Sequence, residues 1–204
     1  MKLFYLSKSP YTRKVRVLAY ETGLNDQIEL QEVDPNLAPV SPDRNLVDKN
    51  PIGKIPTLVL DDGSAIFDSR VICEYLDTLH DGPRMFPREG EARWRVLTRQ
   101  ALADGILDAA VLTRYELALR PEQYRWSEWS DGQKAKFRRA LDVLERDAVS
   151  MRGTVDMGSI AAGCALAYLD FRFAAESWRD GRPALAAWYE EFSARESMQA
   201  SRPQ

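Results

Sequence analysis

The sequence predicts a two-part chain, in which a mixed α/β unit precedes an all-helical unit. At the N-terminus, short apolar runs and helical segments follow one another in a β-α-β plus β-β-α order, which is typical of a small sheet with helices packed on it. A turn-rich stretch comes next, and almost every later segment shows helical periodicity. We therefore expect domains at 1–80 and 89–204, joined by a linker at 81–88.

The first part carries local signals for each of its elements. Pro10 suits the first turn of a helix and Gly23 suits a helix end, whereas Asp62-Gly63 predicts a tight hairpin turn. The expected elements are strands at 2–6 and 28–34, a helix at 10–21, a polar connection at 35–50, two short strands at 57–60 and 65–67, and a helix at 68–79.

The second part is expected to be helical at 94–119, 131–150, 159–175 and 183–195. The most apolar run, Ile160 to Leu169, is too short to cross a bilayer and ends at Asp170. It is therefore interpreted as a buried core helix, and no membrane span is expected.

Composition narrows the classes of function. With 204 residues, 45% apolar and 29% charged, the chain has ordinary globular composition. A formal net charge of −3 argues against nucleic acid as the main partner, since such a protein needs a concentrated basic face. The N-terminus shows no secretion signal, so a cytoplasmic location is expected.

The sequence is poor in metal-binding residues. Cys73 and Cys164 fall on apolar faces of expected helices and are interpreted as core residues. His80 is the only histidine, which argues against a multi-histidine metal site and against a triad that needs imidazole. No metal is expected.

The stretch Gly53-Lys54-Ile55-Pro56 is the strongest candidate for a binding edge. Pro56 stands where a strand begins, one of the few places where a sheet tolerates a residue without an N–H. The N–H and C=O of Ile55 are then available to an extended peptide, which binds as if it were another strand. Taken alone, the Ile55–Pro56 bond is trans by default.

Asp68-Ser69 marks the start of the helix that follows the hairpin. Unpaired N–H groups and the positive end of the helix dipole hold a carboxylate there, although the pair is also an ordinary helix cap when taken alone. A peptide-binding edge beside an anion-binding helix end suits a small anionic peptide.

Ser9-Pro10 connects the first strand to the first helix. Ser before Pro is a routine helix start, and the same hydroxyl would also lie near the thiol of a peptide bound along Ile55. Lowering a thiol pKa from about 8.5 by about two units takes about 2.7 kcal/mol. One hydroxyl hydrogen bond plus a helix dipole is of that size, so no imidazole is required.

Three motifs resemble the glutathione-site motifs of soluble glutathione S-transferases, and the resemblance extends through residues 101–105 and 183–189, so that it covers nearly the whole chain. The motifs are Ser9-Pro10-Tyr11-x-Arg13-Lys14, Asn50-Pro51-Ile52-Gly53-Lys54-Ile55-Pro56-Thr57-Leu58 and Asp68-Ser69-x-x-Ile72-x-Glu74-Tyr75-Leu76. The resemblance implies the glutathione transferase fold, which is an α/β thioredoxin-like N-terminal domain plus an all-α C-terminal helical bundle, assembled as a homodimer.

The resemblance also implies roles for individual residues. Ile55 pairs its backbone with the cysteinyl part of glutathione, the bond before Pro56 is cis, and Asp68 with Ser69 holds the γ-glutamyl end. Ser9 matches the thiol-activating residue of serine-type members. Tyr5, near the place of the activating tyrosine in other members, is an alternative for that role.

The sequence departs from the family pattern at several positions. Ser7 and Ser9 lack the sulfur that cysteine-type members use, which argues against deglutathionylation. Asp68 replaces a longer Glu. The family usually caps its second-domain core helix with Ser or Thr and an Asp three residues later; since Ala162 follows Ser159, half of this cap is expected to be missing.

The leading functional prediction is glutathione transfer to electrophilic, hydrophobic co-substrates. An apolar pocket between the domains is expected on the helix that carries Asp104, Leu107, Val111, Arg114 and Tyr115, although ordinary packing explains the same spacing. A glutathione-dependent peroxidase or isomerase, or a non-catalytic regulatory protein with the same fold, are the alternatives.

Overall fold

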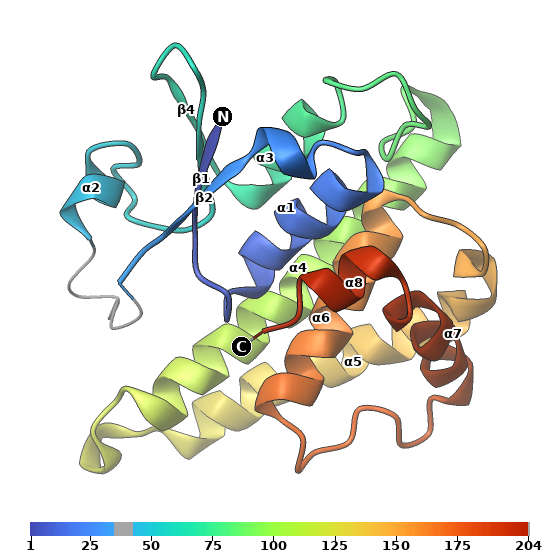
Figure 1. Ribbon diagram of the computed structural model, residues 1–204. Coiled ribbons are helices and arrows are strands. Elements are labelled where there is room, and N and C mark those ends of the chain that lie inside the picture. The colour runs from blue at the N-terminus through green and yellow to red at the C-terminus, as the bar shows by residue number, and fades with distance from the viewer. Residues whose placement is uncertain (35–42, 204) are drawn as a thin grey trace. The chain divides into compact units, whose positions relative to one another are not determined.

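A computed structural model describes residues 1–34 and 43–203 of the chain (Figure 1). The chain divides into two compact units. The first comprises Met1–Phe86 together with Glu196–Gln204, and the second comprises Pro87–Arg195. Each unit contains buried apolar residues of its own.

A four-stranded mixed sheet forms the centre of the first unit. Its strand order is β2-β1-β3-β4, with β1 (Lys2–Tyr5) parallel to β2 (Glu29–Glu32) and antiparallel to β3 (Thr57–Val59), which pairs antiparallel with β4 (Ala65–Ile66). The helices α1 (Pro10–Glu21) and α3 (Ser69–Leu76) pack against each other. This arrangement confirms the expected β-α-β plus β-β-α unit.

Side chains alternate between the two faces of β1. Leu3 is fully buried on one face, whereas Phe4 on the other packs with Val33 and Leu46. Leu46 comes from a short helix, α2 (Arg44–Val47), that was not expected within the polar connection. The rest of that connection, residues 35–42, lies outside the described residues.

The C-terminal segment groups with the first unit, which differs from the expected helical domain at 89–204. Its helix α8 (Glu196–Ala200) packs against α1. The Arg13 guanidinium donates to the Met198 carbonyl over 2.8 Å and to the Ser201 hydroxyl over 3.3 Å. Helical periodicity predicts that a segment is helical but does not say what it packs against.

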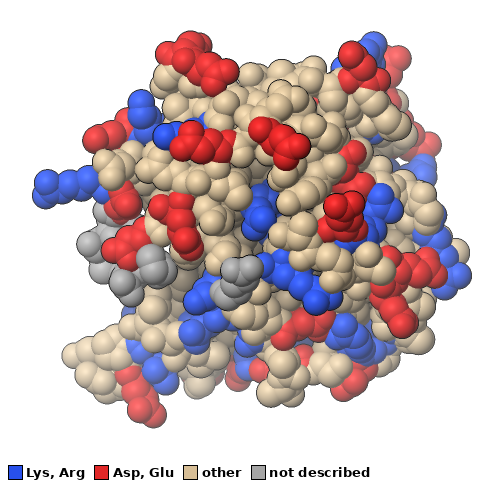
Figure 2. All heavy atoms as spheres, in the orientation of Figure 1, with Lys and Arg blue, Asp and Glu red and all other residues tan. Residues whose placement is uncertain are grey.

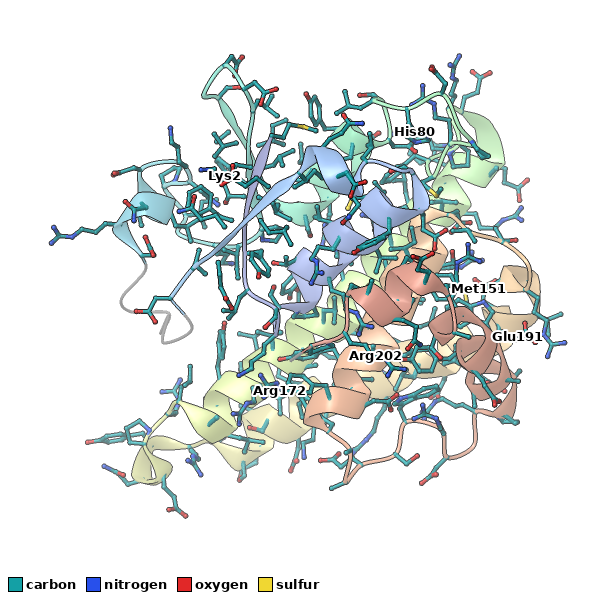
Figure 3. All side chains as sticks on the ribbon, in the orientation of Figure 1. Lys2, His80, Met151, Arg172, Glu191 and Arg202 are labelled. Carbon is teal, nitrogen blue, oxygen red and sulfur yellow. The ribbon has the colours of Figure 1, made fainter. Side chains whose placement is uncertain are left out.

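The expected linker begins in a structured segment of the first unit. The buried Asp77 carboxylate accepts hydrogen bonds from the backbone N–H groups of Met85, over 2.7 Å, and Phe86, over 3.2 Å. It also lies 3.1 Å from Nε2 of His80, whose Nδ1 accepts from the N–H of Gly82 over 3.1 Å (Figure 3). His80 therefore has a structural role in ordering this turn.

The second unit is a helical bundle. Its long helices are α4 (Gly90–Ala118), α5 (Ser127–Met151), α6 (Met157–Arg172) and α7 (Pro183–Ser193). Both α5 and α6 pack against α4, and α7 packs mainly against α5. Every residue of α6 from Met157 to Leu169 is buried, which confirms the prediction of a core helix. The first two helices begin four residues earlier than expected, at Gly90 and Ser127.

The cap of α6 is complete, so the prediction of a half-missing cap was wrong. The Asp156 carboxylate accepts from the Ser159 N–H over 2.7 Å, and the Ser159 hydroxyl accepts from the Asp156 N–H over 2.9 Å. This is a reciprocal capping box. The acidic partner precedes the serine by three residues, whereas the expectation placed it three residues after, at Ala162.

Acidic and basic side chains both spread over the face of the molecule that Figure 2 shows, in keeping with a net charge of −3. Within residues 1–34 and 43–203, no helix combines the length and the apolar character that a bilayer span requires.

Candidate functional site

The sheet register brings Pro56 and Asp68, two of the predicted site residues, to one edge of the first unit. Phe4 is paired with Thr57, and Leu58 with Ile66. Continuing these antiparallel registers by one or two residues sets Pro56 opposite Tyr5 on one side and opposite Asp68 on the other. The end of β1, the start of β3 and the start of α3 therefore meet at the same edge.

The Ile55–Pro56 bond is cis, as the family resemblance implies and contrary to the default for an isolated X-Pro bond. Ile55 lies just before β3, and its partly buried side chain packs against the cluster around Phe4. Its backbone N–H and C=O make no hydrogen bond within the described part of the chain. An anchored side chain with an unpaired backbone is what a strand-like peptide ligand requires.

Asn50 holds the turn before Pro56, a role that the sequence reasoning missed. Its side-chain amide donates to the carbonyl of Lys54 over 2.9 Å and to the hydroxyl of Thr57 over 3.0 Å. Its Oδ1 accepts from the N–H of Ile52 over 3.0 Å, and the residue is 1% exposed. An Asn that starts a turn before Pro is a usable signal, because its side chain commonly bonds nearby backbone groups.

Asp68 and Ser69 form the start of α3, as predicted. One oxygen of the exposed Asp68 carboxylate, Oδ1, accepts from the N–H of Arg70 over 2.8 Å. The other oxygen is available to a cationic group. Ser69 is 3% exposed and is the first residue of the helix, so its hydroxyl lies where the positive end of the helix dipole favours an anion.

Ser9 caps α1. Its Oγ accepts from the N–H of Thr12 over 3.3 Å, with Pro10 in the first helical position, so the ordinary reading of this pair is correct for the structure. A hydroxyl has two acceptor lone pairs and one O–H donor. The cap uses one lone pair and leaves the O–H for donation to a thiolate, so capping and thiol activation are compatible.

Tyr5 stays an alternative to Ser9. It ends β1, is partly exposed, and has the guanidinium carbon of Arg16 5.9 Å from its ring centroid. The contact with Arg16 does not assign the activating role to Tyr5 or to Ser9.

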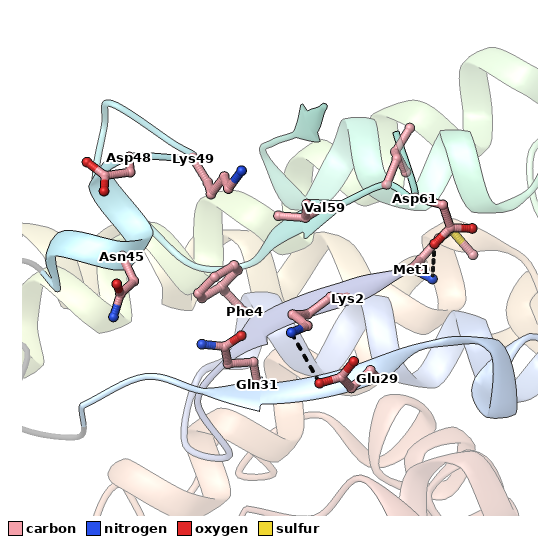
Figure 4. A pocket seen from close by; sticks show the side chains of 11 residues that line it. Met1, Lys2, Phe4, Glu29, Gln31, Asn45, Asp48, Lys49, Val59 and Asp61 are labelled. Atoms are coloured by element: carbon pink, nitrogen blue, oxygen red, sulfur yellow. Dashed lines mark hydrogen bonds and ion pairs between the residues drawn. The ribbon is translucent and has the colours of Figure 1, made fainter. Parts of the chain in front are cut away.

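A groove of about 570 Å³ lies on the sheet face of the first unit that Phe4 occupies (Figure 4). Its walls carry charges of both signs: Lys2 pairs with Glu29 over 3.3 Å, and the N-terminal ammonium pairs with Asp61 over 3.0 Å. It contains none of the predicted site residues. This groove is therefore separate from the predicted site residues around Pro56.

Among residues 1–34 and 43–203, no three or more His, Cys, Asp or Glu side chains are grouped so as to hold a metal ion.

Family models and a full-length relative match this chain. The model of the glutathione S-transferase N-terminal domain matches residues 8–79, and that of the glutathione S-transferase C-terminal domain matches residues 127–191. An uncharacterized GST-like protein of Escherichia coli, YibF, is 36% identical over 206 aligned positions that cover 100% of this chain and 98% of YibF. A stringent starvation protein A homolog of Coxiella burnetii is 36% identical over 42% of this chain and 37% of its own length.

Solved structures of glutathione transferases are also similar to this chain over its full length. A glutathione transferase family member from Pseudomonas fluorescens with bound glutathione is 52% identical, with a TM-score of 0.97 over 100% of this chain and 98% of that one. A second structure of such a protein, with bound S-(propanoic acid)-glutathione, is 50% identical, with a TM-score of 0.92 over 100% of both chains. A glutathione S-transferase of Methylobacillus flagellatus with glutathione bound is 36% identical, with a TM-score of 0.88 over 100% of this chain and 99% of that one.

Proposed function

Because the chain belongs to the glutathione S-transferase family, we propose that it is a glutathione transferase that binds glutathione at the Pro56 edge and directs its thiolate at electrophilic co-substrates. The observation that carries the proposal is the meeting of the unpaired Ile55 backbone with the N-terminus of α3 at that edge. The structures of relatives with bound glutathione support it.

Glutathione has three recognisable parts, and the edge offers a partner for each of the two nearest its N-terminal end. The cysteinyl backbone pairs with the N–H and C=O of Ile55, as a short added strand. The γ-glutamyl carboxylate lies at the start of α3 by Ser69, and its ammonium group is held by the Asp68 oxygen that does not cap the helix.

Ser9 is the proposed activating residue. Its O–H donates to the sulfur and favours the thiolate, while the N-terminus of α1 adds a favourable dipole. A hydrogen bond to a charged group contributes about 1.5–3 kcal/mol, which lowers the thiol pKa by about one to two units. In the reaction the sulfur bonds to the electrophilic carbon, and the leaving group departs with its electron pair.

One relative binds S-(propanoic acid)-glutathione, a ligand with a carboxylic acid group on the glutathione sulfur. By analogy with that ligand, we propose that the co-substrates of the present chain include electrophiles that bear a carboxylate. We also propose a homodimer in the cytoplasm, with a role in detoxification. Exposed apolar side chains on the first unit, such as Ile52 at 62% and Val71 at 52%, favour an interface between copies.

The alternative is a regulatory protein that keeps the fold without catalysis. Several stringent starvation protein A homologs are 34–39% identical to this chain, each over less than half of its length. The matches to the stringent starvation protein A homologs are partial, whereas the matches to structures with bound glutathione span the whole chain. We therefore favour the glutathione transferase over the regulatory protein.

The test is to measure glutathione binding by calorimetry and conjugation of a chlorodinitrobenzene by absorbance, for the wild type and for Ser9→Ala, Tyr5→Phe and Ser7→Ala. We expect binding in all four, with turnover reduced only in Ser9→Ala; Ser7→Ala is the matched loss of a neighbouring hydroxyl. Binding without turnover by the wild type supports the regulatory alternative. Loss of turnover in Tyr5→Phe alone transfers the activating role to Tyr5.

A further inference from the structure

Arg13 anchors the beginning of α1 to the C-terminal segment of the first unit, whose helix α8 packs beside α1 (Figure 1). The Arg13 guanidinium donates from Nη2 to the Met198 carbonyl over 2.8 Å and from Nε to the Ser201 hydroxyl over 3.3 Å. The Ser201 side chain is itself fixed, since it is fully buried and donates to the Ser197 carbonyl over 2.7 Å. The last carbonyl groups of a helix have no partner within it, so Arg13 satisfies an acceptor that α8 leaves free.

The Arg13 guanidinium is a buried cation without an acidic partner. Arg13 is 6% exposed, and it takes part in no ion pair within residues 1–34 and 43–203. In contrast, the buried Arg99 of the second unit pairs with Asp147 over 2.6 Å. A buried charge is unfavourable unless hydrogen bonds compensate it. The two oxygen atoms of the C-terminal segment therefore determine where the Arg13 side chain lies.

The backbone of Arg13 is bonded to Ser9, one turn earlier. The Arg13 N–H donates to the Ser9 carbonyl over 3.1 Å, and the Ser9 hydroxyl accepts from the Thr12 N–H over 3.3 Å. Both distances lie at or beyond the long end of the usual range of about 2.7–3.2 Å. The start of a helix frays readily because its first N–H groups have few partners. A side chain anchored one turn inside the helix therefore limits the movement of Ser9.

We propose that Arg13 is a positioning residue, whose bonds to Met198 and Ser201 hold the start of α1 so that the Ser9 hydroxyl meets the glutathione sulfur. This inference rests on the proposed function, because it concerns the hydroxyl that we propose activates the thiol. Hydrogen bonds weaken steeply as their geometry departs from linear, so a small displacement of Ser9 lowers the fraction of thiolate. The positive charge of Arg13 favours the thiolate as well.

Two buried serines of the C-terminal segment provide a matched pair of variants. Ser201→Ala removes the hydroxyl that accepts from Arg13, whereas Ser197→Ala removes a hydroxyl that donates over 2.5 Å to Glu21, the last residue of α1. Ser201 is 0% exposed and Ser197 is 4% exposed. Each change deletes one buried hydroxyl, so the two variants should lose comparable stability in urea unfolding.

The two serine variants should differ in the pKa of the bound thiol, measured by the ultraviolet absorbance of the thiolate. We expect Ser201→Ala to raise this pKa by about 0.5, so that kcat/KM for a chlorodinitrobenzene near pH 6.5 falls about threefold and recovers at high pH. The affinity for glutathione should change less than about twofold, because the Ile55 backbone and the start of α3 are intact. Ser197→Ala should keep the wild-type pKa and pH profile.

Substitutions of Arg13 itself give a graded series. Arg13→Gln removes the charge and the planar fork of donors, so the thiol pKa should rise by about one and kcat/KM near pH 6.5 should fall about tenfold. Arg13→Lys keeps the charge as a compact ammonium group without that fork, and its thiol pKa should lie between those of the wild type and Arg13→Gln.

Amide hydrogen exchange of Thr12, followed by NMR without glutathione, reports directly on the same turn. It should be about fivefold faster in Ser201→Ala than in the wild type, and unchanged in Ser197→Ala. An unchanged thiol pKa in Arg13→Gln, or equal effects of the two serine variants on the pKa and on Thr12 exchange, would overturn the inference. Failure of the wild type to bind glutathione counts against the proposed function, and the exchange rates of Thr12 then decide whether Arg13 holds this turn.

Discussion

Replacement of Ser9 by alanine removes two interactions that have different readouts. One is the cap of α1, in which the Ser9 Oγ accepts from the Thr12 N–H over 3.3 Å; its loss costs about 0.5–2 kcal/mol of stability. The other is the proposed O–H bond to the glutathione sulfur, about 1.5–3 kcal/mol, whose loss raises the bound thiol pKa by about one to two units. The variant should therefore be less stable and less active.

Aspartate at the same position separates the two effects. Ser9→Asp keeps an acceptor for the Thr12 N–H, so the stability of α1 should return to within about 0.5 kcal/mol of the wild type. It has no O–H to donate and places a negative charge near the sulfur, so the thiol pKa should rise at least as far as in Ser9→Ala.

The assay is the ultraviolet absorbance of the thiolate, titrated with pH in the complex with glutathione, beside kcat/KM for a chlorodinitrobenzene. Below the thiol pKa, kcat/KM falls tenfold for each pH unit, so both variants should lose about tenfold to a hundredfold near pH 6.5 and recover at high pH. Urea unfolding gives the stability. An unchanged thiol pKa in Ser9→Asp would refute the reasoning and leave Ser9 with the cap alone.

Three further predictions concern particular contacts. Asn50→Ala should lower stability by about 2–3 kcal/mol, since it removes bonds to a buried turn, and should weaken glutathione binding in calorimetry at least as much as stability; unchanged affinity would dissociate the turn from the site. Gly158→Ala would place a Cβ 3.0 Å from the Arg99 Cβ, so urea unfolding should show that the free energy of unfolding falls by about 1–3 kcal/mol. An unchanged free energy of unfolding would mean that α4 and α6 can move apart at this point without cost. Burial acts to raise the pKa of Glu176, but hydrogen bonds and charge from Lys134 and Arg138 of α5 lower this pKa overall. The ionised carboxylate therefore stabilises the folded protein above about pH 4.3. This contribution is lost as the pH falls through the lowered pKa of the folded state. Glu176→Gln should flatten this acid dependence, and identical slopes of stability against pH in the two proteins would contradict it.

Local signals in the sequence were sufficient for the starts of α1 and α3. Ser9-Pro10 and Asp68-Ser69 are caps because their own side chains bond the next backbone N–H groups, and such bonds need no distant partner. Pro56 marks the start of a strand for the same reason, since a missing N–H is a property of the residue itself. The helical half follows from periodicity along the chain.

Contacts between distant segments were beyond the sequence. One local contact was also missed, because Asp156, three residues before Ser159, completes the cap of α6. The C-terminal segment is bound to the first unit through Arg13, 185 residues away from Met198 in sequence. The packing of α6 along α4 likewise joins two helices whose pairing no local pattern indicates.

The amino-acid order alone determined the starts of α1 and α3 and the place of Pro56 just before β3, because these depend on residues within about one turn of each other. Tertiary structure decided what comes together: the register that sets Pro56 between Tyr5 and Asp68, and the packing of α6 along α4 in the second unit. The physical reason is that pairing of remote segments depends on the summed burial and hydrogen bonding of the whole unit, which no single stretch contains.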